Sequence, residues 1–196
     1  MLLDKLQIAL WSLTYVLVIA GGSRTGATPR RFCMPLVAGC LNFCWEVNAL
    51  IISGGMWGHV LWLALDAVIL YQNMRYLNSR FQKRGVFAYF SALVVISLLL
   101  AVLFRIPGWD GILYTSYTAD LVMAAEYVAA AKQISQNCKL SIAICKLLGD
   151  LFAWLFYFRD SLYVAVTGAI VLVLNLFYLC WCIEERERTR RKVRKH

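Results

Sequence analysis

Apolar stretches of about twenty residues recur along nearly the whole chain, and only short polar connections separate them. A helix needs about 20 residues to cross a bilayer. We count seven such stretches, at residues 6–21, 33–53, 55–74, 86–104, 112–131, 140–157 and 162–182. The composition agrees, because 61% of the residues are hydrophobic and 16% are charged, whereas soluble domains carry about 25% charged residues. The sequence therefore predicts an all-α, polytopic membrane protein.

The placement of Lys and Arg tests the number of spans, because these residues concentrate on the cytoplasmic side of membrane proteins. With seven spans, sixteen of the 20 Lys and Arg residues fall on one side and three, Lys5, Arg105 and Arg159, fall on the other. Lys146 stays inside a span. This asymmetry predicts a bundle of seven transmembrane helices with the N-terminus outside and the C-terminus in the cytoplasm. Several stretches are only just long enough to cross, so six helices with one re-entrant segment remain an alternative.

Two further expectations concern the ends of the chain. Positive charge follows the first apolar stretch instead of preceding it, so we expect a retained helix and no cleaved signal peptide. Residues 1–183 are expected to form one transmembrane domain, and residues 184–196 a basic cytoplasmic tail. Because seven of the Lys and Arg residues lie in this tail, directly after an apolar segment, membrane lipids are expected partners and nucleic acid is not.

Motifs for metal, phosphate and nucleophilic chemistry are missing from the sequence. The seven cysteines are odd in number and form no CxxC pair, so free thiols are expected in place of disulfides or a metal site. Glycine-rich phosphate loops, GxSxG, HExxH and DDxxD patterns are also missing. We expect no metal and no cofactor, and we interpret His59 as an interface residue near a helix end.

Ionisable residues inside the apolar stretches are the strongest indication of function. An ionisable group at the bilayer centre costs about 2.5–3.5 kcal/mol even on the lenient insertion scale. Six lie within expected spans: Glu46, Asp66, Asp120, Glu126, Lys146 and Asp150. Four of the acids come from different spans and fall at similar depths, in the outer half to the middle of the membrane. These four, Glu46, Asp66, Asp120 and Asp150, are the candidate catalytic residues.

These acids are not equivalent. Lys146 and Asp150 have i, i+4 spacing, so an ion pair can account for both of them, and Asp66 can equally serve as a hydrogen-bonded tie between helices. Glu46 has no cation within reach on its own helix, while Asn42 lies one turn before it and Trp45 lies beside it. A carboxyl in such surroundings is expected to keep its proton near neutral pH. Glu46 is therefore a candidate general acid.

Several short patterns occur at corresponding places along the chain. They are the segment from Cys40 to Val47, which reads NxxWE and contains Glu46, the segment Trp62–Asp66, the segment around Gly149 followed by Arg159, and the run Leu174–Trp181 before the charged tail. Together with the chain length and the number of spans, these patterns resemble the integral-membrane terpene cyclases of fungal meroterpenoid and indole-diterpene pathways and their bacterial relatives.

This resemblance implies a metal-independent cyclase of the protonation-initiated type, acting on a prenylated or terpenoid small molecule. Glu46 matches the family's first essential acid, and Asp66 corresponds to its aspartate in the third helix. At the position of the second essential acid, in the last helix, this chain has Asn175, which can neither donate nor accept a proton as a carboxyl does. Asp120 or Asp150 is then expected to supply that function. The location implied is the plasma membrane of a bacterium or the endoplasmic reticulum of a fungus.

A carbocation needs a dry wall without nucleophiles, and aromatic faces stabilise its charge. Candidate substrate-binding residues are Asn42, Trp45, Trp62, Tyr117, Trp154 and Asn175, although each aromatic residue can equally be explained by helix packing. Two other functions remain open. Buried carboxyls also carry protons or cations in small transporters and channels, and polar residues hold helices together in non-catalytic membrane scaffolds.

Overall fold

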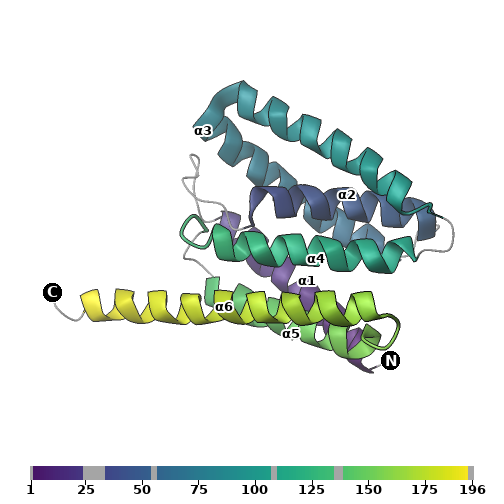
Figure 1. Cartoon of the computed structure of the whole chain (residues 1–196). Coiled ribbons are helices and arrows are strands. Elements are labelled where there is room, and N and C mark those ends of the chain that lie inside the picture. The colour runs from purple at the N-terminus through teal and green to yellow at the C-terminus, as the bar shows by residue number, and fades with distance from the viewer. Residues whose placement is uncertain (1, 24–33, 54–56, 107–109, 135–138, 194–196) are drawn as a thin grey trace.

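The computed structural model describes residues 2–23, 34–53, 57–106, 110–134 and 139–193. All six elements in these ranges are α-helices (Figure 1). They are α1 (Leu2–Ser23), α2 (Leu36–Ser53), α3 (Trp57–Leu103), α4 (Gly111–Ala129), α5 (Lys139–Tyr157) and α6 (Leu162–Val193).

Four of these helices, α1, α3, α5 and α6, contain segments long and apolar enough to cross a membrane. The helix α2 is also apolar, but its apolar segment, Leu36–Ile52, is shorter than those of these four helices. The expected all-α fold is confirmed for the described residues, and several of its helices suit a membrane protein by length and composition.

The number of helices differs from the expected seven because the third and fourth apolar stretches belong to one element, α3. The connection between them, residues 75–85, contains no proline, and its only glycine, Gly85, comes at its end. Because few residues in this connection break a helix, it stays helical except at Gln82 (φ 58°, ψ −156°). The chain reverses its direction at that residue, without a separate loop. Figure 1 shows the two arms of α3 diverging from this bend.

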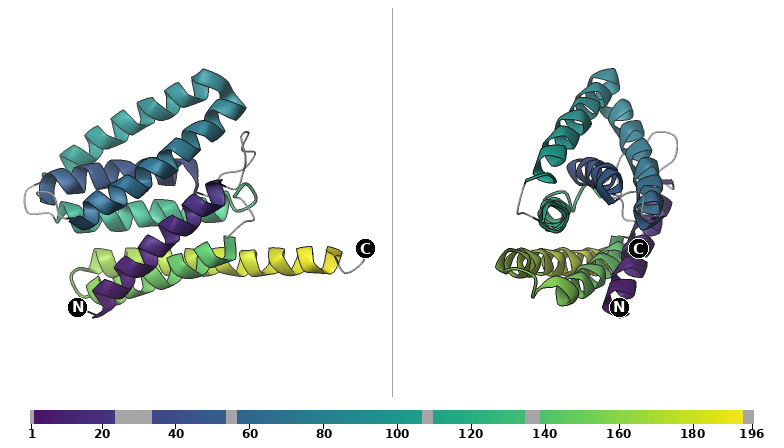
Figure 2. Two further views of the ribbon diagram at one scale, coloured as in Figure 1. Left: turned by 180° about the vertical axis from the view of Figure 1, so that it is seen from behind. Right: turned by 90° about the vertical axis from the view of Figure 1, so that its right-hand side faces the viewer.

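Helix contacts arrange the bundle around α2 and α4. In the end-on view of Figure 2, the two arms of α3 form an inverted V that holds α2, and α4 lies below it. The helices α5 and α6 pack together on the other side of α4, and α1 contacts both α5 and α3. The N-terminus and the α5–α6 turn lie at one end of the bundle, and the C-terminus and the bend of α3 lie at the other (Figure 1).

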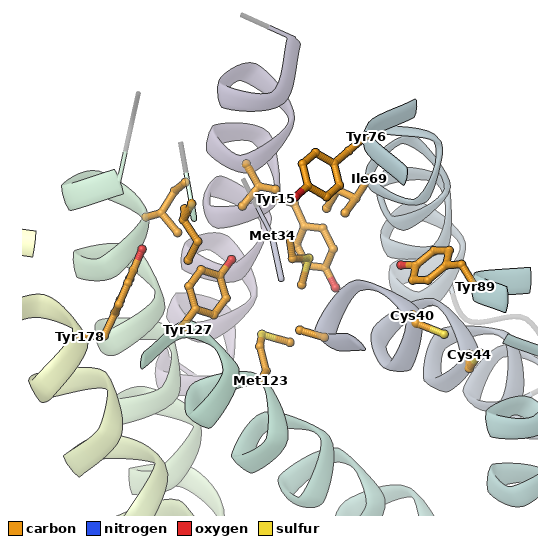
Figure 3. Close-up of a cluster of buried hydrophobic side chains, with 14 of the residues drawn as sticks. Tyr15, Met34, Cys40, Cys44, Ile69, Tyr76, Tyr89, Met123, Tyr127 and Tyr178 are labelled. Carbon is orange, nitrogen blue, oxygen red and sulfur yellow. The ribbon is translucent and has the colours of Figure 1, made fainter. Parts of the chain in front are cut away.

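Buried hydrogen bonds tie α2 to the arms of α3. Tyr89 donates its hydroxyl proton to the carbonyl of Leu36 at 2.8 Å and accepts from the Asn73 amide at 3.2 Å, so it links the two arms to the start of α2. Figure 3 shows Tyr89 in the buried cluster beside Cys40 and Cys44. Such satisfied polar contacts hold helices together in lipid, where water cannot compete for them.

The last helix continues through the expected start of the basic tail. No break occurs at residue 184, and α6 extends to Val193. Ion pairs one turn apart lie along this segment, between Arg188 and Glu184 at 3.3 Å and between Arg191 and Glu187 at 3.6 Å.

Five described cysteines, among them Cys40, Cys44 and Cys182, are free thiols, while Cys33 and Cys138 fall outside the described residues.

The bend of α3 generates a stability prediction. The backbone of Gln82 occupies a region that is almost restricted to glycine, at a cost of about 1–3 kcal/mol for other residues. Its side chain is exposed, so a substitution there changes mainly the backbone energy. Gln82→Gly is expected to raise the free energy of unfolding by about 1 kcal/mol, measured by thermal unfolding in detergent. The control, Gln82→Ala, keeps the strain and should not stabilise. If Gln82→Gly is less stable than Gln82→Ala, the positive-φ backbone conformation assigned to residue 82 is wrong.

Candidate functional site

A cavity of about 510 Å³ opens among the helix ends next to the N-terminus. Its volume is in the range of small-molecule sites. Its lining residues come from the first part of α1, the middle of α2, the start of α3, the first half of α4, and the end of α5. The lining residues that matter for chemistry are Tyr15, Trp45, Glu46, His59, Trp62 and Asp120.

Glu46 lies in the wall of this cavity and is 3% exposed. Its Oε2 atom is 2.9 Å from Nδ1 of His59, which also lines the cavity. The sequence predicts no partner for Glu46 on its own helix, and the structure supplies one from the start of α3. His59 lies near a helix end, as expected, but its contact with Glu46 could not be predicted from spacing within one helix.

Two tryptophans flank the Glu46–His59 pair. The His59 ring centroid is 5.8 Å from the Trp45 ring and 6.3 Å from the Trp62 ring. Both indoles are held by their N–H groups: Trp45 donates to Thr115 Oγ1 at 2.9 Å, and Trp62 donates to Ser12 Oγ at 3.2 Å. Their orientation is thereby fixed, as expected for walls of a defined binding site.

Asp120 brings another carboxyl to the same cavity from α4, and Asp4, Asp110 and Asp160 also line it. Within the described ranges its side chain forms no hydrogen bond, although it interacts electrostatically with Asp150 and Lys146. Tyr117, one turn before Asp120, also lines the cavity. Its buried hydroxyl has no hydrogen-bond partner among the described residues. Both side chains are therefore free to contact a bound molecule.

Asn42 and Asp66 meet at a tyrosine that the sequence analysis missed. The Tyr15 hydroxyl donates to Asp66 Oδ2 at 3.3 Å and accepts a hydrogen bond from the Asn42 amide. Tyr15 and Asn42 line the cavity, whereas Asp66 is fully buried behind them. Figure 3 shows Tyr15 pointing from α1 toward α2. No helix-local pattern marks Tyr15, because its partners come from two other helices.

Asp150 and Asn175 form a separate buried cluster. Lys146 donates to Asp150 Oδ2 at 2.6 Å, which confirms the i, i+4 ion pair, and the Asn175 amide donates to the same oxygen. These side chains are at most 4% exposed and are not among the residues that line the cavity. Trp154 also lies outside the lining, and its indole N–H donates to the Ala165 carbonyl at 3.0 Å.

Glu126 has a structural explanation. Its Oε2 atom accepts a hydrogen bond of 2.6 Å from the backbone N–H of Ala38 in the first turn of α2. The first amides of a helix have no partner within the helix, and a carboxylate there also complements the helix dipole. Glu126 thus caps α2 from a neighbouring helix and contributes no chemistry to the cavity.

Comparison of the chain with protein-family models, curated proteins and solved structures gives no match. The resemblance to membrane terpene cyclases therefore depends on the sequence patterns alone. Across the described residues, no three or more His, Cys, Asp or Glu side chains are grouped to hold a metal ion.

The buried ion pair generates a second prediction. Lys146→Met leaves Asp150 charged and buried without its cation, which typically costs about 3–5 kcal/mol, whereas Lys146→Met combined with Asp150→Asn removes both charges. We expect the double variant to be more stable than the single one, as measured by thermal unfolding in detergent. If the double variant loses as much stability as Lys146→Met and Asp150→Asn lose together when each is made alone, the ion pair is not formed.

Proposed function

We propose that this protein is a membrane-bound terpene cyclase that protonates an alkene or epoxide of a prenyl chain and cyclises it through carbocations. The observation that carries the proposal is that the Glu46 carboxyl, paired with His59, faces a cavity walled by Trp45 and Trp62. An acid with a hydrogen-bond partner beside an aromatic-walled cavity is what protonation of a weakly basic alkene requires.

In the proposed reaction the Glu46 carboxylic acid donates its proton to one carbon of an alkene. The π electrons form the new C–H bond, and the neighbouring carbon becomes a cation, which the next alkene attacks to close a ring. Loss of a proton from the last cation regenerates a double bond, so substrate and product are isomers. The His59 imidazole stabilises the Glu46 carboxylate left by the first step. Asp120 then releases the proton that it gained to water, and a proton from water returns to Glu46 through His59, which resets both carboxyls.

Asp120 is the proposed base for the final proton loss. It lines the same cavity as Glu46 and has no hydrogen-bond partner in the part of the chain that the structure describes. Asp150 is a weaker candidate, since Lys146 and Asn175 occupy its Oδ2 atom and it does not line the cavity. Asp66 is a positioning residue in this proposal, because it does not line the cavity and contacts Tyr15, which does.

The remaining lining suits a prenyl substrate with one polar end. The Trp45 and Trp62 faces stabilise positive charge as it moves along the chain, and each such contact contributes about 0.5–2 kcal/mol. The unpaired Tyr117 hydroxyl can hydrogen-bond an oxygen of the substrate. An apolar substrate dissolved in the bilayer would enter between helices, which explains a membrane location for a small enzyme.

We also propose that the two arms of α3 cross the membrane separately, giving seven crossings with the N-terminus outside and the C-terminus in the cytoplasm. Arg75, Arg80, Lys83 and Arg84 lie around the bend of α3, at the end of the bundle that also holds the basic end of α6 (Figure 1). The positive-inside rule supports a cytoplasmic position for this end.

Mutation of Glu46 tests the proposed function. Membranes containing the protein should convert a prenylated or epoxyprenylated acceptor to a cyclised isomer, detected by mass spectrometry. Glu46→Gln should lower turnover at least about 100-fold, since it removes the general acid. Glu126→Gln is the matched control, because Glu126 lies outside the cavity, and turnover per folded molecule should persist.

Unchanged turnover in Glu46→Gln would contradict the assigned role. Proton flux into liposomes that depends on Glu46 and Asp120, without conversion of any prenylated acceptor, would instead favour a small proton-coupled transporter.

A further inference from the structure

A second cavity, of about 370 Å³, lies at the opposite end of the bundle between the start of α5 and the last turns of α6. Its lining is mostly polar, with three basic residues and one acid, and includes Lys139, Ser141, Glu185, Arg186, Thr189 and Arg190. None of these residues takes part in the cavity that contains Glu46. The proposed cyclisation therefore leaves this site unexplained.

An ion pair between a buried lysine and a partly exposed glutamate lies in the wall of this cavity. Lys139 Nζ is 2.8 Å from Glu185 Oε2 and 4.3 Å from the centre of the Trp181 ring, and the Lys139 side chain is only 5% exposed. Because Glu185 balances Lys139, the pair fixes the geometry of the wall without leaving a net charge. The net charge of the cavity then comes from the two arginines.

Arg186 and Arg190 lie one turn apart on α6 and both line the cavity. Neither forms an ion pair with another residue in the described ranges, whereas the neighbouring Arg188 and Arg191 pair with Glu184 and Glu187. Two guanidinium groups that converge on one cavity without carboxylate partners form a binding site for an anion with several acceptor oxygens.

The cavity lies at the depth of lipid headgroups. From Leu162, where α6 begins, to Cys182 in the cavity wall, the helix rises about 30 Å, which is the thickness of the hydrocarbon core. The positive end of the α5 dipole is also here, since α5 begins at Lys139. Trp181 below the site fits the aromatic belt at a membrane interface.

Apolar side chains continue from the cavity toward the membrane interior. Ile144 and Leu148 follow Ser141 on one face of α5 at helical spacing, and both are exposed, at 41% and 36%. A headgroup in the cavity would place its acyl chains along these two residues. This continuity favours a phospholipid over a free phosphate compound.

We propose that this cavity binds the phosphate of an anionic phospholipid, held by Arg186 and Arg190 against the Lys139–Glu185 pair. The site ties the end of α6 to the membrane surface on the side opposite the Glu46 cavity. It is independent of the cyclase proposal, since no residue of one cavity lines the other.

Native mass spectrometry of the full chain in detergent, titrated with phosphatidylglycerol or phosphatidylcholine, tests this site. The double variant Arg186→Gln, Arg190→Gln should bind phosphatidylglycerol about 30-fold more weakly. The matched control, Arg188→Gln with Arg191→Gln, removes the same charge from the same helix outside the cavity and should change the dissociation constant less than twofold. Phosphatidylcholine should bind far more weakly than phosphatidylglycerol and should not discriminate between the variants.

Equal weakening by both double variants would show general attraction to the basic helix and would overturn the site. No weakening by either would overturn it as well. Glycerol 3-phosphate provides the remaining arm: if it displaces phosphatidylglycerol completely at equal concentration, the site recognises a free phosphate compound and the lipid assignment is wrong. All four substitutions are at exposed positions, so thermal unfolding of the variants should match that of the unchanged chain.

Discussion

The structure depends on one constraint: a carboxyl group within an apolar helix needs a partner inside the protein, because lipid offers none. Four of the five acids within the expected spans have such a partner. Glu46 meets His59, Asp66 meets Tyr15, Glu126 meets the Ala38 amide, and Asp150 meets Lys146. Each partner except Lys146 comes from another helix, so these contacts also determine which helices pack together. Asp120, the fifth acid, is directed to the Glu46 cavity instead.

The acids therefore form two groups, those with a structural role and those that are candidates for catalysis. Glu126 and Asp150 are accounted for by a helix cap and a buried ion pair, and neither lines the Glu46 cavity. Glu46 and Asp120 line it together, among fixed tryptophans. The two ends of the bundle differ in the same way, since acids line the cavity near the N-terminus, and two arginines without an ion pair among the described residues line the cavity near the C-terminus. The helices between these two ends include four that are long and apolar enough to cross a membrane.

The sequence predicts what depends on composition and on spacing within one helix. It predicted the all-helical class with apolar helices of membrane length, and the Lys146–Asp150 pair. Four of the candidate substrate-binding residues, Asn42, Trp45, Trp62 and Tyr117, line the Glu46 cavity, and substrate binding itself stays a prediction. The sequence missed His59 and Tyr15, because their partners lie on neighbouring helices at separations that no periodic pattern records. It also separated the two arms of α3, since a connection rich in Arg and Lys resembles a loop, whereas one residue, Gln82, makes the whole reversal. Asn175 was expected at the site from the family resemblance and Trp154 as an aromatic wall, and the structure places both in hydrogen bonds between α5 and α6.

The central claim is that the reaction begins with a proton delivered to carbon in the Glu46 cavity. Cyclisation in heavy water tests it most directly, with a prenylated phenol that carries an unoxidised terminal alkene as the substrate. The account predicts a cyclised product that retains one deuterium on carbon, at the position that received the first proton, after back-exchange into ordinary water. A cyclised product without deuterium on carbon would show that the ring closes without initial protonation, and would contradict the account.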